Sequence, residues 1–374
     1  MSGLARMVIK VGTAVITEES GRVSRDRVAV LVDGIAGARE AGIDVALVSS
    51  GAIAAGVERL GLDRRPADLD TLQAVASVGQ GLLMTMYADM FASRGITAGQ
   101  VLLTQYDITH RQQYLNARHT LDRLFSMGVV PVVNENDTVA TEEITFGDND
   151  MLAALVASLV KADLLVLLTD TAGLHTADPR TSGEARLIEV VEKVTEEIEC
   201  LGGEAGSDRA LGGMSSKVQA AKAAVSTGVA TIIADGREPS TIGRVIEGER
   251  PGTYFPAAGR VTSKKHWIGY ATMACGTLVV DAGAVGALQE RGGSLLPAGV
   301  TDVRGEFGIG DSVDIEDASG RLIARGLSNY SSTEARKVKG LRSQQVEQVL
   351  GERAEEMVHR DELVVFGPEA GGSP

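Results

Sequence analysis

Residues 129–150 read VVPVVNENDTVATEEITFGDND and carry the strongest signals for both the fold and a binding site. The apolar, β-branched run at 129–133 is typical of a strand buried on both faces of a parallel sheet. Two polar clusters follow, NEND at 134–137 and GDND at 147–150, before a run with helical periodicity at 151–160. In open α/β sheets, ligands bind beyond the carboxyl ends of the strands. This order of segments therefore predicts a site in the connection.

Each polar cluster also has an ordinary structural explanation. NEND could form an Asx-rich turn, and GDND could cap the N-terminus of the following helix. However, the two clusters together bring six Asn and Asp side chains into one connection. Their combination favours a site for a small polar molecule.

The alternation of strand and helix continues from residue 7 to about 235. We expect strands at 7–15, 44–48, 99–103, 129–133, 163–168 and 229–234, and helices at 28–41, 67–92, 116–127, 151–160, 192–199 and 218–226. This pattern predicts an α/β fold with an open, mostly parallel sheet and helices on both faces.

The sequence changes character after Gly252. Short strands are expected at 276–281, 310–316 and 320–326, with a hairpin turn at 317–320 and a helix over 338–350. We therefore predict an α/β domain at 1–255, a linker at 256–275, a small β-rich domain at 276–366 and a disordered tail at 367–374.

The composition excludes several classes of protein. The 374 residues include 44% hydrophobic and 23% charged residues, as in an ordinary soluble globular protein. A net charge of −14 argues against broad binding to nucleic acid or to a membrane surface. Cys200 and Cys275 are far apart and no CxxC pattern occurs, which argues against a zinc site or a disulfide framework. We expect a cytoplasmic protein, because no signal-peptide core or long apolar span is found.

Two lysines occupy unusual positions. Lys10 lies within an apolar strand, where a charge is costly unless it meets an anion or the strand lies at an edge. Lys217 ends the segment GGMSSK at a loop-to-helix junction that suits phosphate, although this is not a Walker A sequence. A lysine in the first turn of a helix opposes the helix dipole, so a bound anion explains it better than simple solvation.

These segments resemble those of the bacterial glutamate 5-kinase family. The shared motifs are KVGT at 10–13, SGA at 50–52, NEND at 134–137, FGDND at 146–150, TD at 169–170 and GGMSSK at 212–217. The resemblance covers nearly the whole chain and implies an amino acid kinase fold followed by a PUA-like domain, with LLPAGV at 295–300 and residues 305–313 as recognisable pieces. Leu211 departs from the family pattern, which has a small or hydroxylated residue there, and puts one nucleotide contact in question.

The resemblance implies ATP- and Mg²⁺-dependent phosphorylation of the side-chain carboxylate of L-glutamate, the first step of proline biosynthesis. It assigns catalysis to Lys10, Lys217 and Asp150, and substrate binding to Ser50, Gly51, Ala52, Asn134, Asp137 and Asn149. It assigns ATP binding to Lys10, Gly12, Thr13, Thr169, Asp170, Leu211, Gly212, Gly213, Met214, Ser215, Ser216 and Lys217. We expect ATP phosphates to hold Mg²⁺, with Asp150 as the protein group that could help to organise it.

The resemblance further implies a homo-oligomer and inhibition by L-proline, with the loop at 138–146 as its sensor. Two alternatives stay open. One is another kinase of the superfamily, acting on aspartate, N-acetylglutamate, carbamate or a nucleoside monophosphate. The other is RNA binding by the PUA-like domain through Arg336, Lys337, Lys339 and Arg342, although residues 276–374 contain 10 Lys and Arg against 16 Asp and Glu.

Overall fold

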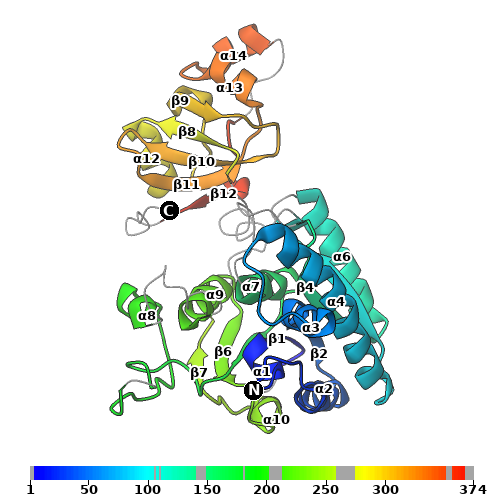
Figure 1. Cartoon of the computed structure of the whole chain (residues 1–374). Coiled ribbons are helices and arrows are strands. Elements are labelled where there is room, and N and C mark those ends of the chain that lie inside the picture. The colour runs from blue at the N-terminus through cyan, green and yellow to red at the C-terminus, as the bar shows by residue number, and fades with distance from the viewer. Residues whose placement is uncertain are drawn as a thin grey trace. The chain divides into compact units, whose positions relative to one another are not determined.

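The computed structural model describes residues 4–104, 107–108, 111–139, 149–179, 182–201, 213–257, 274–350 and 356–366. The chain divides into two compact units, residues 1–260 and residues 261–374 (Figure 1). The finer domain bounds and the linker at 256–275 stay predictions, and the predicted tail at 367–374 lies outside the described residues. No helix within the described ranges combines the length and the apolar character needed to cross a membrane.

Unit 1 is built on a seven-stranded sheet with the order β3-β4-β2-β1-β5-β6-β7. Its strands are β1 (Arg6–Val11), β2 (Asp44–Ser49), β3 (Ala98–Leu103), β4 (Val130–Glu135), β5 (Leu164–Thr169), β6 (Ala230–Asp235) and β7 (Thr253–Phe255). Neighbouring strands pair in parallel except β6 and β7, which are antiparallel. The predicted open, mostly parallel sheet is confirmed. The edge strand β7 was not predicted, because three residues are too few to show a period.

Helices cover both faces of this sheet, as predicted (Figure 1). They are α1 (Thr13–Ile16), α2 (Arg25–Glu40), α3 (Ala52–Leu60), α4 (Leu69–Ala92), α6 (Arg111–Ser126), α7 (Asn149–Leu159), α8 (Glu196–Leu201), α9 (Met214–Ser226) and α10 (Thr241–Ile246). Met7, Ile9 and Val11 of β1 belong to one core cluster with residues of α2 and α4. Side chains alternate across a strand, so Lys10 points to the opposite face, where it meets α7.

Two local predictions in unit 1 need refinement. The strand predicted at 7–15 ends at Val11, and the short helix α1 begins at Thr13. The segment predicted as one or two helices at 67–92 is the single helix α4 despite its glycines. A Cβ at Gly79 would lie 1.7 Å from the carbonyl oxygen of Ala52. This glycine therefore lets α3 and α4 approach closely instead of breaking α4.

Unit 2 contains a five-stranded sheet with the order β12-β11-β10-β8-β9. Its strands are β8 (Gly276–Val280), β9 (Val300–Gly305), β10 (Ser312–Asp317), β11 (Leu322–Leu327) and β12 (Leu363–Val365), and its helices are α12 (Ala282–Gln289), η2 (Pro297–Gly299), α13 (Ser332–Val338), α14 (Ser343–Leu350) and η3 (Arg360–Glu362). The predicted β-rich character and the β10–β11 hairpin are confirmed. The single helix predicted at 338–350 is wrong, because Gly340 adopts a positive φ of 77° between α13 and α14.

Candidate active site

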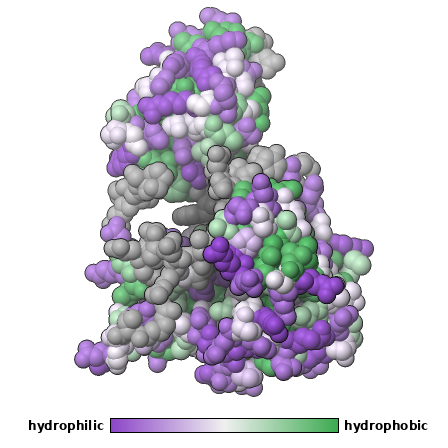
Figure 2. Space-filling view, viewed as in Figure 1, coloured by the Kyte–Doolittle hydropathy of each residue, from purple (hydrophilic) through white to green (hydrophobic). Residues whose placement is uncertain are grey.

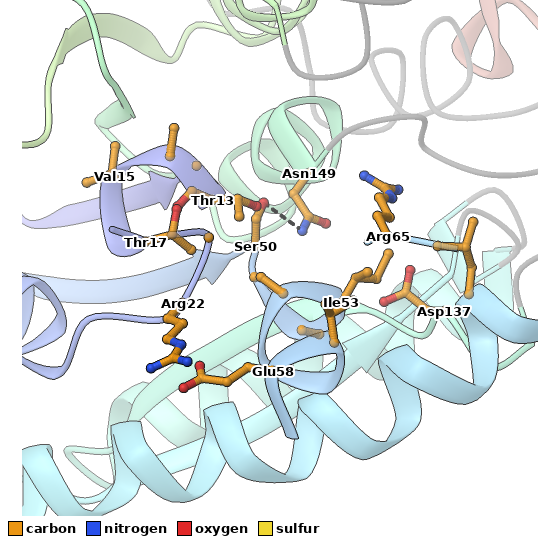
Figure 3. A pocket seen from close by; sticks show the side chains of 18 of the residues that line it. Thr13, Val15, Thr17, Arg22, Ser50, Ile53, Glu58, Arg65, Asp137 and Asn149 are labelled. Carbon is orange, nitrogen blue, oxygen red and sulfur yellow. Dashed lines mark hydrogen bonds between the residues drawn. The ribbon is translucent and has the colours of Figure 1, made fainter. Parts of the chain in front are cut away.

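The carboxyl ends of four adjacent strands, β4, β2, β1 and β5, open into one cavity of about 1000 Å³. Figure 3 shows side chains from several elements of unit 1 converging on it. The predicted site residues that line this cavity are Lys10, Gly12, Thr13, Ser50, Gly51, Ala52, Asn134, Asp137, Asn149, Thr169, Asp170 and Lys217. Parallel strands place their carboxyl ends at one edge of the sheet, which is why residues so distant in sequence meet here.

Two buried lysines meet on one carboxylate at this cavity. Asp150 stands in the first turn of α7 and is fully buried. Its Oδ1 lies 2.5 Å from Lys10 Nζ, and its Oδ2 lies 3.0 Å from Lys217 Nζ. Lys10 is 2% exposed and Lys217 is 3% exposed, so both depend on this carboxylate for compensation. Within the described part of the chain, two ammonium groups meet at this one carboxylate, and this concentration of positive charge suits an anion such as phosphate.

The loop before α9 supports this cluster. Gly213 is the N-cap of α9, and Met214, Ser215 and Ser216 form its first turn. Ser216 Oγ lies 3.0 Å from Asp150 Oδ2 and 2.8 Å from the carbonyl oxygen of Gly213. The start of α9 is thereby tied to the carboxylate between the lysines. Leu211 and Gly212 lie outside the described residues, so their contacts to a nucleotide stay predictions.

The N-terminus of α3 supplies a second group of donors. Gly51 is its N-cap with a φ of +105°, a conformation that L side chains rarely adopt, and no described side chain caps this end. The first backbone N–H groups of the helix, beginning at Ala52, lack partners within the helix. Ala52 also lines the cavity, and the free donors favour an anionic group there.

Three amide side chains form a chain of hydrogen bonds beside this helix end. Asn149 Nδ2 lies 3.2 Å from Ser50 Oγ and 2.8 Å from Asn134 Oδ1. Asn134 Nδ2 in turn donates to Gln80 Oε1 over 2.6 Å. The sequence predicted Asn134 and Asn149, but it missed Gln80. Its signal was a polar residue between two glycines in the largely apolar stretch 74–84 of α4.

Asp137 lines the cavity close to Arg65, as Figure 3 shows. Burial raises the pKa of its carboxyl group above the ordinary value, and the nearby Arg65 works in the opposite direction. A carboxylate desolvated in this way gains from a cation in the cavity. Arg65, Arg22 and Glu58 also line the cavity and were not predicted. They come from polar loop and helix-end segments that look like ordinary surface in the sequence.

The end of β5 carries the residues predicted to contact a nucleotide. Thr169 Oγ1 lies 3.3 Å from Asp170 Oδ1, and Asp170 Oδ2 pairs with Arg237 Nη2 at 3.2 Å. Arg237 follows β6, the neighbour of β5, and was not predicted. A Cβ at Gly236 would lie 2.8 Å from side chains of Leu168 and Val15, so this turn requires glycine.

Comparisons with known proteins identify the family of this chain. Residues 5–235 match the Amino acid kinase family, and residues 276–350 match the PUA domain. The Glutamate 5-kinase of Moorella thermoacetica is 48% identical over 98% of this chain and 98% of its own. That of Ralstonia nicotianae is 47% identical over 96% of this chain and 97% of its own.

The chain belongs to the glutamate 5-kinase branch of the amino acid kinase family. Among solved structures, carbamate kinase from Giardia lamblia bound to AMP-PNP is 20% identical, with a TM-score of 0.48, over 69% of this chain and 100% of that chain. The predicted amino acid kinase fold with a C-terminal PUA domain is confirmed by the two family matches.

In this member of the glutamate 5-kinase family, the described residues do not form a metal centre. No group of three or more described His, Cys, Asp or Glu side chains could hold a metal ion. Both oxygens of Asp150 already contact a lysine ammonium group, which leaves this carboxylate poorly suited to bind Mg²⁺ directly. Asp150 therefore fits the positioning of the two lysines better than a role as a metal ligand.

Two of the four basic residues predicted for RNA binding form ion pairs within the PUA domain. Arg336 Nη1 lies 2.9 Å from Glu306 Oε1, and Lys339 Nζ lies 2.9 Å from Asp302 Oδ1. These pairs reduce the positive field that RNA binding would need.

The loop predicted as a proline sensor begins at Thr138, but residues 140–148 lie outside the described ranges.

Proposed function

We propose that this protein transfers the terminal phosphoryl group of ATP to the side-chain carboxylate of L-glutamate. The product is L-glutamyl 5-phosphate, and the reaction is the first step of proline biosynthesis. The pairing of Lys10 and Lys217 on Asp150 at the cavity is the observation that carries the proposal. Phosphoryl transfer between two anions depends chiefly on positioning and on positive charge, and this cluster supplies both.

In the proposed reaction, a side-chain carboxylate oxygen of glutamate attacks the γ-phosphorus of ATP. The bond from this phosphorus to the β,γ-bridging oxygen breaks, and its electron pair leaves with ADP. The attacking carboxylate is already ionised near neutral pH, so the step needs no general base. Lys10 and Lys217 stabilise the charge on the transferring group, and Asp150 holds both ammonium groups in position.

The amino acid binds in the part of the cavity that is formed by the start of α3, Asp137 and Asn149. Backbone donors at the start of α3, with Ser50 and Gly51, suit its α-carboxylate. Asp137 and the amide oxygen of Asn149 suit its α-ammonium, because both residues line the cavity and this oxygen has no hydrogen-bond partner among the described residues. This arrangement favours an amino acid with a free ammonium over N-acetylglutamate.

The nucleotide side is formed by the ends of β1 and β5 and by the start of α9. Gly12, Thr13, Thr169 and Asp170 line the cavity there. The substrate is MgATP, in which the metal ion neutralises phosphate charge; we assign it no protein ligand.

The test is ATP consumption with L-glutamate, L-aspartate and N-acetyl-L-glutamate measured side by side. We expect L-glutamate to give the highest kcat/KM. Aspartate is one methylene shorter, so its side-chain carboxylate would lie at a different distance from the ammonium site, and N-acetylglutamate lacks the ammonium. A higher kcat/KM for either alternative acceptor would overturn the proposal.

We propose that L-proline inhibits by competing for the amino acid site. Proline offers the same α-carboxylate and an ammonium to the acceptors Asp137 and Asn149, but it has no side-chain carboxylate to phosphorylate. Initial rates against glutamate at several proline concentrations should show a rising KM with an unchanged kcat. Inhibition that does not depend on glutamate would exclude this mechanism.

We also propose that the chain forms a homo-oligomer and works in the cytoplasm. Figure 2 shows apolar side chains gathered over part of the visible face of unit 1. Exposed large apolar side chains near the α3–α4 region are Leu60, Leu62, Val78 and Leu82. Such a patch supports a protein interface. Light scattering after size-exclusion chromatography tests this, and a monomer at micromolar concentration would contradict it.

A further inference from the structure

Gln80 stands outside the cavity lining and is not among the residues that the proposed reaction uses. Its Oε1 accepts a hydrogen bond from Asn134 Nδ2 at 2.6 Å, from the middle of α4. Gly79 beside it packs α4 directly against the start of α3. The Gln80 side chain therefore reaches the site from a helix that close packing holds in place.

The direction of the amide chain is fixed by the backbone. The N–H group of Glu135 donates to Asn134 Oδ1 at 2.9 Å, so this atom of Asn134 must be the oxygen. Its Nδ2 then faces Gln80, which must present its own oxygen. At the other end, Asn149 must donate through Nδ2, because it meets Asn134 Oδ1 and the carbonyl oxygen of Ser49.

One acceptor is left over by this arrangement. Asn149 Oδ1 is buried and has no hydrogen-bond partner among the described residues. Figure 3 shows this oxygen pointing away from Ser50, toward the side of the cavity where Asp137 lies. A buried acceptor without a partner costs about 1–3 kcal/mol, so a ligand that brings an N–H donor is favoured at this point.

We propose that Gln80 is a positioning residue that fixes the orientation of Asn134 and Asn149 and thereby makes the site selective for a free α-ammonium. This inference rests on the proposed function and deepens it. Without the Gln80 acceptor, the Nδ2 group of Asn134 loses its partner and the Asn134 side chain turns to find another. Asn149 then keeps its bonds to Ser49 and Ser50 but loses the one to Asn134 Oδ1, which at 2.8 Å is the shortest of the three that orient its amide.

The test compares two ligands that differ in the ammonium alone. L-Glutamate is measured as substrate, and glutarate, which has both carboxylates but no ammonium, is measured as a competitive inhibitor. Gln80→Met removes the acceptor at nearly constant volume, whereas Gln80→Glu retains an acceptor. We expect Gln80→Met to raise the KM for glutamate about tenfold, equivalent to about 1.4 kcal/mol, and to leave the Ki of glutarate and the KM for ATP within about twofold. Gln80→Glu should stay close to wild type.

The controls separate positioning from general damage. Thr85→Ala alters an exposed side chain on the same helix that bonds only within α4, and should leave every constant unchanged. If Gln80→Met does not fold, Gln80→Asn withdraws the same amide by one methylene and gives the same readout. Equal losses for glutamate, glutarate and ATP, or unchanged discrimination between glutamate and glutarate, would overturn the role of Gln80. A wild-type enzyme that does not phosphorylate glutamate would instead overturn the proposed function itself.

Discussion

Replacing Asp150 by asparagine leaves the shape of the site almost unchanged and removes the charge on which two buried lysines meet. Coulomb's law gives about 5 kcal/mol for one such pair at 3 Å with an effective dielectric constant of about 20. The asparagine dipole and local rearrangement recover part of this. Removal of one partner from a buried ion pair costs about 3–5 kcal/mol, which we take as the expected loss of unfolding free energy.

Scanning calorimetry should show this loss as a fall of about 6–20 °C in the Tm of the transition of unit 1. Turnover should fall by at least about a hundredfold, because Lys10 and Lys217 lose the group that holds them in position. The KM for glutamate should change much less, since Asp150 does not line the cavity.

The double variant Asp150→Asn with Lys10→Met provides the matched control. It deprives one buried ammonium of the Asp150 carboxylate instead of two, so part of the lost stability should return while activity stays low. Our reasoning would be refuted if Asp150→Asn kept a Tm within about 2 °C of wild type, or if the double variant were less stable than Asp150→Asn.

Substitutions at three further residues test the site. Lys217→Ala should retain the fold and lower kcat by about a hundred- to a thousandfold, because one contact that stabilises the transferring group is lost. Turnover within about threefold of wild type would exclude this role of Lys217. Burial raises the pKa of Asp137, so its ionised form is lost as pH falls through that raised value. The KM of the wild type for glutamate should therefore rise on acidification. In Asp137→Asn this KM should be high and nearly independent of pH. The same raised pKa means that ionised Asp137 costs stability at neutral pH, so chemical denaturation should find Asp137→Asn at least as stable as wild type. Gly79→Ala should lower the unfolding free energy by at least about 1–3 kcal/mol and raise the KM for glutamate, because the added Cβ would lie 1.7 Å from the carbonyl oxygen of Ala52. An unchanged Tm would contradict the close packing of α3 and α4.

The sequence predicted most elements of unit 1 because their patterns are local. The run VVPVV at 129–133 and its counterparts mark strands that are buried on both faces, and the polar residues that follow them mark the carboxyl ends. Lys10 was predicted to meet an anion because a charge in an apolar strand needs a partner. Short elements gave no such signal, so β7, the start of α1 and the break at Gly340 became visible only in the structure.

The sequence by itself thus determined the fold class, the edge of the sheet where the site lies and twelve of the residues that line it. Only the tertiary structure decided which of them touch. Strand order places β4, β2, β1 and β5 side by side, and this brings Lys10 and Lys217 to Asp150 and Gln80 to Asn134. Local patterns record which residues are buried and in which kind of element, whereas pairing depends on strand order, register and helix packing between distant segments. For that reason the amide chain, with its one unpartnered oxygen on Asn149, had no signature in the sequence.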